Sequence, residues 1–204
     1  KTEHELQSAQ IQLAHRIAEL EIRTQELNLL TEMTNMLQIC ASTSEAISVI
    51  AQYANDLFPG VGGVLYTQTA DENVMKGGAF WGNYTGEPEI NHKDCWGLRR
   101  GRIHTTQDSQ SSLYCRHMGF PQPSSSICVP VMSSGQAIGL LSLQTPLDAP
   151  TLTVAQQKLA AATAEQIGLA LSNLNLRQNL REMAIRDSLT GLYNRHFLEE
   201  TLET

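Results

Sequence analysis

The sequence has few charged residues, and basic residues are the scarcer kind. Only 17% of the 204 residues are charged, and 14 Lys and Arg stand against 21 Asp and Glu, for a formal net charge of −7. Because proteins that bind nucleic acid meet its phosphates with clustered Lys and Arg, we expect no nucleic-acid partner. The sequence also lacks an apolar run of the roughly 20 residues that cross a bilayer, and it opens with no secretory signal. We therefore expect no membrane contact and a cytoplasmic location.

The short motifs that accompany many catalytic sites are also missing. No Gly-rich phosphate loop precedes a predicted helix, and there is no nucleophile elbow. The glycines at 60, 62 and 63 predict a loose turn and do not form a nucleotide fingerprint. The four cysteines are unevenly spaced and do not suggest a disulfide-rich scaffold, so we expect reduced thiols.

Proline and glycine are absent from the first 58 residues, where helices are predicted. One long helix is predicted over 4–39, a second helix over 42–57, and another long helix over 153–185. Apolar residues at intervals of seven in both long helices favour a parallel coiled coil over a helix packed only on its own domain. The chain begins without Met inside a helical pattern, so we interpret it as a fragment. The heptad positions are Leu6, Leu13, Leu20 and Leu27, then Ala162, Leu169, Leu176 and Met183.

Between the helices the sequence predicts an antiparallel sheet. Strands are predicted over 62–67, 74–81, 126–132 and 137–143, and the turn at 133–136 joins the last two as a hairpin. Pro130 indicates a sheet edge or a bulge, because proline cannot donate to the strand ladder. Residues 82–125 are rich in Gly, Pro, Asn, Ser and His, and they predict a long loop region.

The order of these elements resembles that of a GAF domain over residues 41–148. The helix at 42–57, the strand at 64–67 and the hairpin at 126–143 carry the resemblance, which covers about half of the chain. It implies an α/β (α+β) fold with an antiparallel sheet, here flanked by long N- and C-terminal coiled-coil helices. In such domains the long loop folds over one face of the sheet and lines a ligand pocket.

A second resemblance lies at the C-terminus. Residues 186–195, with the sequence RDSLTGLYNR, resemble the opening motif of GGDEF domains, the output module of diguanylate cyclases. The Gly-Gly-Asp/Glu-Glu-Phe signature that binds GTP and metal in that family is absent from the sequence. The resemblance therefore implies a parent diguanylate cyclase, while this fragment itself is expected to have no cyclase activity.

The two resemblances imply a four-part organisation of the chain. It comprises a signalling helix over 1–40, a GAF sensor over 41–148, a linker helix over 149–186 and a truncated GGDEF N-terminus over 187–204. We expect a homodimer formed through the flanking helices. The sensor would pass its state through these helices to a GGDEF output domain in cis, as part of c-di-GMP signalling.

Two cysteines and two histidines within 23 residues make the long loop the most informative segment. Thiolates and imidazoles are the ligands of tetrahedral zinc sites and of softer metals. We therefore predict a site for zinc, iron or a metal cofactor at Cys95, His104, Cys115 and His117. The GAF resemblance further implies that an unidentified small ligand could occupy a pocket lined by Asp94, Cys95, Trp96, Cys115 and His117.

Other interpretations of the loop cysteines stay open. The loop also resembles free methionine sulfoxide reductases, which are GAF-type enzymes, and Cys95 and Cys115 would then be reactive pocket thiols. Alternatively, the cysteines are small buried apolar residues in a dimerisation domain without a ligand. A bilin is not expected, because Arg116 separates Cys115 from His117, whereas bilin-binding GAF domains have Cys directly followed by His. The remaining cysteines, Cys40 and Cys128, are predicted to be structural.

Overall fold

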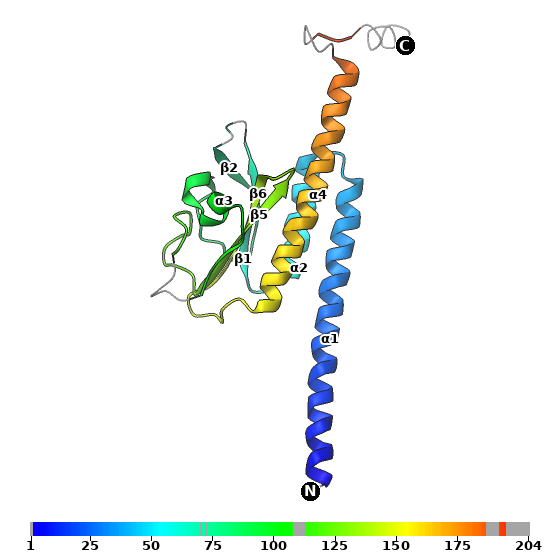
Figure 1. Ribbon diagram of the computed structural model, residues 1–204, viewed down its shortest axis with the longest axis vertical. Coiled ribbons are helices and arrows are strands. Elements are labelled where there is room, and N and C mark those ends of the chain that lie inside the picture. Colours follow the sequence, from blue (N-terminus) through cyan, green and yellow to red (C-terminus); the bar gives the residue numbers. More distant parts are fainter. Residues whose placement is uncertain (1, 70, 72, 108–112, 187–191, 195–204) are drawn as a thin grey trace.

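The computed structural model describes residues 2–69, 71, 73–107, 113–186 and 192–194. Three helices cover one face of a six-stranded sheet, and shorter elements cover the other face (Figure 1). Most of the GGDEF-like motif, and all of 187–204 except 192–194, lies outside the described residues. The helices are α1 (Thr2–Ile39), α2 (Thr43–Leu57), α3 (Trp96–Arg100) and α4 (Val154–Ile185), with a 3-10 helix, η1 (His92–Asp94).

The sheet is antiparallel throughout, in the order β3-β2-β1-β6-β5-β4. The predicted hairpin is present as β5 and β6, with a bulge between Val131 and Met132. Pro130 lies just before this bulge. It also lies beyond the residues of β5 that pair with β4, so no described strand pairs with that edge of β5 at this position. The strands are β1 (Gly62–Gln68), β2 (Val74–Trp81), β3 (Glu89–Asn91), β4 (His104–Thr106), β5 (Ser125–Ser133) and β6 (Gln136–Thr145).

Side-chain caps fix the starts of two helices. The Ser42 hydroxyl accepts a hydrogen bond from the Glu45 amide (3.2 Å), and the Glu45 carboxylate accepts one from the Ala41 amide (2.7 Å). At α4, the Thr153 hydroxyl accepts from the Gln156 amide (3.2 Å), and the Gln156 side chain accepts from the Thr153 amide (2.9 Å). The Ser42 and Thr153 hydroxyls thereby satisfy amides that the first turn of a helix leaves unpaired, and the bonds at α4 form a reciprocal capping box.

The larger core lies between the sheet and the three helices α1, α2 and α4. Alternate residues of β5 point into it, and α4 lies close against that strand. Gly168 permits this approach, since a Cβ there would lie 2.7 Å from the carbonyl oxygen of Met132. The fully buried members of this core include Met33, Leu37, Ile50, Leu65, Ile127, Val131, Leu141, Leu143 and Ile167.

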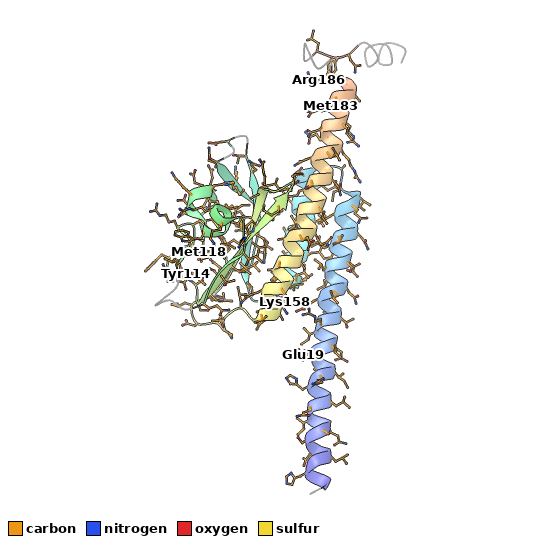
Figure 2. The ribbon with its side chains drawn as sticks, viewed as in Figure 1. Glu19, Tyr114, Met118, Lys158, Met183 and Arg186 are labelled. Atoms are coloured by element: carbon orange, nitrogen blue, oxygen red, sulfur yellow. The ribbon has the colours of Figure 1, made fainter. Side chains whose placement is uncertain are left out.

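The two long helices extend beyond the sheet at opposite ends. Helices α1 and α4 lie side by side and run in the same direction (Figure 1), and the Arg177 side chain donates to the carbonyl oxygen of Gln38 (3.3 Å). The stick view shows side chains projecting from both extensions (Figure 2). Leu6, Leu13, Leu20 and Leu27 are between 55% and 65% exposed. Among the described residues, no helix combines the length and apolar character needed to cross a membrane.

Candidate functional site

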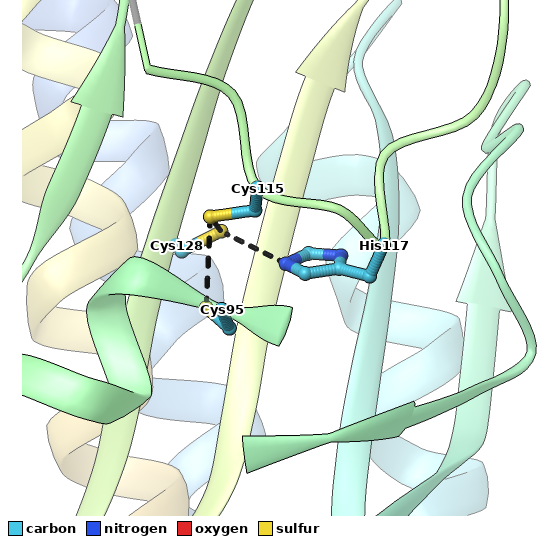
Figure 3. A group of neighbouring side chains, drawn as sticks. All are labelled: Cys95, Cys115, His117 and Cys128. Atoms are coloured by element: carbon cyan, nitrogen blue, oxygen red, sulfur yellow. Dashed lines mark hydrogen bonds between the residues drawn. The ribbon is translucent and has the colours of Figure 1, made fainter. Parts of the chain in front are cut away.

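Four donor side chains meet on the face of the sheet opposite the three large helices. Cys95 precedes α3, Cys115 and His117 lie on the segment that leads to β5, and Cys128 lies within β5 (Figure 3). One donor atom from each residue lies within 4.8 Å of all the others. We call these four residues the Cys/His cluster.

The cluster is tightly spaced and buried. The Cys115 sulfur lies 3.9 Å from the Cys95 sulfur and 3.9 Å from the Cys128 sulfur. Nε2 of His117 lies 3.5 Å from the Cys128 sulfur. None of the four side chains is more than 4% exposed. All four cysteines of the chain are free thiols, so no disulfide competes for these sulfur atoms.

Strand alternation places Cys128 in the cluster. Ile127 and Val129 point into the helix-side core, so Cys128 between them points to the opposite face, where Cys95 and Cys115 belong to a second, smaller core. Gly97 allows α3 to lie directly on this strand, because a Cβ at that position would already be 3.1 Å from Cys128.

Backbone hydrogen bonds position the other three members. The Arg116 amide donates to the carbonyl oxygen of Asp94 (2.9 Å), which joins the Cys115 segment to the end of η1. The Met118 amide donates to the carbonyl oxygen of Cys115 (3.2 Å), closing a turn at Arg116 and His117. The Trp96 amide donates to the Cys115 sulfur itself (3.3 Å).

The electrostatic environment favours a thiolate at Cys115. Hydrogen bonding with the Cys128 and Cys95 thiols, with smaller contributions from His117 and the Trp96 amide, lowers the pKa of Cys115 well below its ordinary value, although burial opposes this. The same hydrogen bonds raise the pKa of Cys95 to about 12 and raise that of Cys128 as well.

The structure brings together three of the four predicted metal ligands, and the fourth member of the cluster is Cys128 in place of His104. His104 lies on β4 opposite Cys128, but its Nε2 is hydrogen-bonded to the carbonyl oxygen of Leu113 (2.8 Å), and it is not part of the cluster. Cys128, which we had interpreted as structural, takes its place. The alternation of apolar residues around Cys128 was the sequence signal that could have placed it on the cluster face.

The predicted ligand-pocket residues divide between the surface and the interior. Asp94 and Trp96 line a surface hollow of about 650 Å³. Cys95, Cys115 and His117 are buried instead, although their sequence neighbours form the walls of this hollow. The Arg99 guanidinium lies over the Trp96 ring, 4.4 Å from its centre. The remaining lining residues of the hollow are Lys93, Arg99, Leu113, Tyr114, Arg116 and Gln122.

Comparison with known proteins identifies the family. The family model of the GAF domain matches residues 42–171, well over half of the chain. The chain belongs to the GAF domain family. The predicted fold, an antiparallel sheet with flanking helices in a mixed α/β arrangement, is confirmed. No curated protein matches the sequence.

Solved GAF structures share this fold at low sequence identity. The GAF domain of the phosphoenolpyruvate-protein phosphotransferase from Acinetobacter superposes with a TM-score of 0.61 at 14% identity, covering 74% of this chain and 95% of that one. The type II free methionine-R-sulfoxide reductase from Thermoplasma acidophilum gives a TM-score of 0.51 at 20% identity, covering 70% and 96%. The free methionine-R-sulfoxide reductase from Neisseria meningitidis, solved with its substrate, gives 0.59 at 13% identity, covering 74% and 91%.

Proposed function

We propose that this GAF domain is the sensory and dimerising module of a diguanylate cyclase. Binding of a ligand at the Cys/His cluster would change the packing of α4, and α4 would transmit this change to a GGDEF output domain in cis. The observation that carries the proposal is the arrangement of β5, which holds Cys128 on one face and packs against α4 with the other. The GGDEF-like motif over 186–195, which follows α4 in the sequence, supports the nature of the output.

The proposed path from the cluster to the helix is short. A ligand that shortens the distances between the side chains of the Cys/His cluster would displace Cys128 and, with it, the backbone of β5. Val131, three residues further along β5, points into the core shared with α4, and the Met132 carbonyl faces Gly168 of that helix. A small displacement of β5 would therefore act directly on α4, which requires two alternative packings of similar free energy.

A homodimer is part of this proposal. The heptad leucines of α1 and the apolar residues Leu169, Leu176 and Met183 of α4 are exposed. Since α1 and α4 run in the same direction, a parallel partner would cover both sets and align two output domains next to one another. A cytoplasmic location follows from the same proposal, because its output would act on GTP.

The proposed ligand of the cluster is a metal ion, zinc or iron, or a metal cofactor. Three sulfurs and one imidazole nitrogen are donors of the right type. The hollow above the cluster is the alternative place for a small ligand, and its Lys93, Arg99 and Arg116 side chains would suit an anion. The order Cys115-Arg116-His117 still argues against a bilin.

A chimaera tests the relay. The chain would be joined at residue 186 to an active GGDEF domain, and synthesis of cyclic dinucleotide from GTP would be measured with and without metal. We expect the rate to depend on metal, and Cys128→Ser to abolish that dependence without abolishing synthesis. A rate that is unchanged by metal and by Cys128→Ser would exclude the cluster as the sensor input. This chain alone is expected to yield no product.

A thiol-dependent reductase is the second candidate function. The contacts of the Cys115 sulfur with the sulfurs of Cys95 and Cys128 favour it, together with the likeness to free methionine-R-sulfoxide reductases. The burial of all three thiols opposes it, because a substrate could not reach them in this conformation. Incubation with free methionine sulfoxide and a dithiol is expected to give no methionine. Activity that disappears in Cys115→Ser would instead make the reductase the first candidate.

A further inference from the structure

The spacing of the donor atoms in the Cys/His cluster fits one particular kind of metal site. In a tetrahedral zinc site, with Zn–S distances of about 2.3 Å and a Zn–N distance of about 2.0 Å, neighbouring sulfurs lie about 3.8 Å apart and a sulfur and nitrogen about 3.5 Å apart. In the structure these separations are 3.9 Å and 3.9 Å for the two sulfur pairs and 3.5 Å for Cys128 and His117. Three of the six edges of the cluster therefore match such a tetrahedron, and the donor atoms of the other three pairs lie within 4.8 Å of one another.

We propose that one Zn²⁺ ion is bound by the sulfurs of Cys95, Cys115 and Cys128 and by Nε2 of His117. This inference deepens the proposed function, because it names the ion at the site that the sensor would read. It differs from the set predicted from sequence in one ligand, Cys128 in place of His104.

The imidazole of His117 lacks strong hydrogen-bond partners that would explain its burial. Nε2 of His117 has its hydrogen-bonding contact with the Cys128 sulfur, and Nδ1 is buried without a partner among the described residues. A buried imidazole whose hydrogen bonds are only weak contacts to sulfur is costly, because it has given up its hydration. Coordination through Nε2 replaces that lost interaction by a bond to the metal.

The donor set also narrows the choice of metal. Three thiolates and an imidazole are soft or intermediate ligands, which favour zinc and disfavour Mg²⁺ and Ca²⁺, whose ligands are oxygen atoms. Four protein ligands complete a tetrahedral shell and leave no open position for a water molecule, so this ion would organise structure and would not catalyse hydrolysis. The Trp96 amide, which donates to the Cys115 sulfur, would stabilise the charge on one thiolate.

The ligands come from three separate parts of the chain, so the ion would join them. Cys95 lies next to α3, Cys115 and His117 lie on the segment before β5, and Cys128 lies in the sheet. Because all four side chains are buried, the ion would leave only when the segment around Cys115 opens away from β5. Metal binding and the packing of this layer would then be one event.

Metal analysis of the reduced protein tests the inference. We expect one zinc per chain after purification, and again after removal by a chelator and reconstitution with Zn²⁺. Cys128→Ser and His117→Gln should each lose the stoichiometric zinc. Two matched controls should keep it, namely His104→Gln, which changes the ligand predicted from sequence, and Cys40→Ser, which changes the buried cysteine outside the cluster.

Cobalt substitution provides a measurement on the unmutated protein, in case a ligand variant fails to fold. Co²⁺ in place of zinc should give the visible bands of a tetrahedral ion together with a sulfur-to-cobalt charge-transfer band in the near ultraviolet. Octahedral cobalt bands, no metal binding, the absorption of an iron–sulfur cluster or haem, or zinc lost by His104→Gln but kept by Cys128→Ser would each overturn the inference.

This result is independent of the relay. A monomer that holds one zinc would support the metal site and contradict the proposed dimeric sensor. A dimer whose chimaeric cyclase responds to another ligand, but which binds no zinc, would contradict the metal site and leave the sensor function standing.

Discussion

At the scale of single residues, burial alone does not distinguish the four cysteines. Cys40 is as well buried as the cluster cysteines, yet its thiol donates only to the carbonyl oxygen of Met36 one turn earlier in α1 (3.3 Å). The sulfurs of Cys95, Cys115 and Cys128 instead contact one another. What separates a structural cysteine from a candidate metal ligand here is the chemistry of its neighbours.

Tyr84 gives a prediction about alkaline pH. Burial is the largest of the causes that raise the pKa of Tyr84 from 10.0 to about 12, and its hydroxyl lies 3.0 Å from that of Tyr66. A phenol whose pKa is raised on folding stabilises the protein fully below about pH 10, and this contribution is lost as the pH rises toward about 12. Between about pH 9 and pH 11 we expect a loss on the order of 1 kcal/mol from this group.

Urea unfolding at several pH values, with the protein and Tyr84→Phe side by side, measures this effect. The variant lacks the ionisable group, so its free energy of unfolding should fall less steeply with pH above about pH 10. Ultraviolet titration of the folded variant should likewise lose one late-ionising phenol. Identical pH dependence of the two proteins would show that Tyr84 ionises equally well in the folded and unfolded states.

The sequence identified three members of the Cys/His cluster and missed one, for a physical reason. Cys95, Cys115 and His117 stand out because they lie in a loop region with little periodicity. Cys128 lies in an apolar strand, where a cysteine is usually a small core residue. His104 was grouped by sequence proximity, but β4 holds its ring near the Leu113 carbonyl. Only the fold shows which side chains share one layer of the sheet.

At the scale of helices and strands, the long and periodic elements were predictable and the short ones were not. Helices over 4–39, 42–57 and 153–185 and the hairpin over 126–143 are present with nearly the predicted ends. Strands β3 and β4, helix α3 and η1 have three to five residues each and lie in the predicted long loop. A period of two or of about 3.6 residues cannot be recognised over so short a length.

Strand β5 is the element on which the proposed coupling depends, and Gly168 tests its contact with α4. An added Cβ at Gly168 would lie 2.7 Å from the Met132 carbonyl oxygen, which is backbone and cannot rotate away. Although alanine favours helix over glycine by about 1 kcal/mol, we expect Gly168→Ala to lower the free energy of unfolding by about 1–3 kcal/mol, because α4 must shift from β5.

Urea unfolding measures this change, and Glu165→Ala on the exposed side of α4 is the control. Glu165→Ala should alter stability by less than about 0.5 kcal/mol, as expected for a surface substitution. In the chimaeric cyclase, Gly168→Ala should also reduce the response to metal more than Glu165→Ala does. A Gly168→Ala variant that is more stable than the unmutated protein would mean that helix propensity outweighs the contact with β5.

At the scale of the whole molecule, the long helices are only partly used within one chain. The buried residues of α1, Met33 and Leu37, lie in its C-terminal part, while the leucines of its N-terminal extension are exposed. Exposed leucines repeated over four heptad positions are unfavourable for an isolated chain in water, and they favour a partner helix. The sequence pattern alone could not show which part of α1 packs on its own domain, since both parts carry apolar residues at helical spacing.

Leu20 tests whether the N-terminal extension forms the dimer. Sedimentation should report about twice the chain mass of 22.5 kDa for the unmutated protein. Leu20→Asp places a charge at an exposed heptad position and should shift the protein toward monomer at micromolar concentration. Ala18→Asp is the matched control, because it introduces the same charge two residues away, on the opposite side of the helix. Ala18→Asp should leave the dimer intact.

If both variants weaken the dimer equally, the added charge explains the effect. If neither variant weakens it, the leucine stripe of α1 is not the interface, and α4 would have to provide the interface.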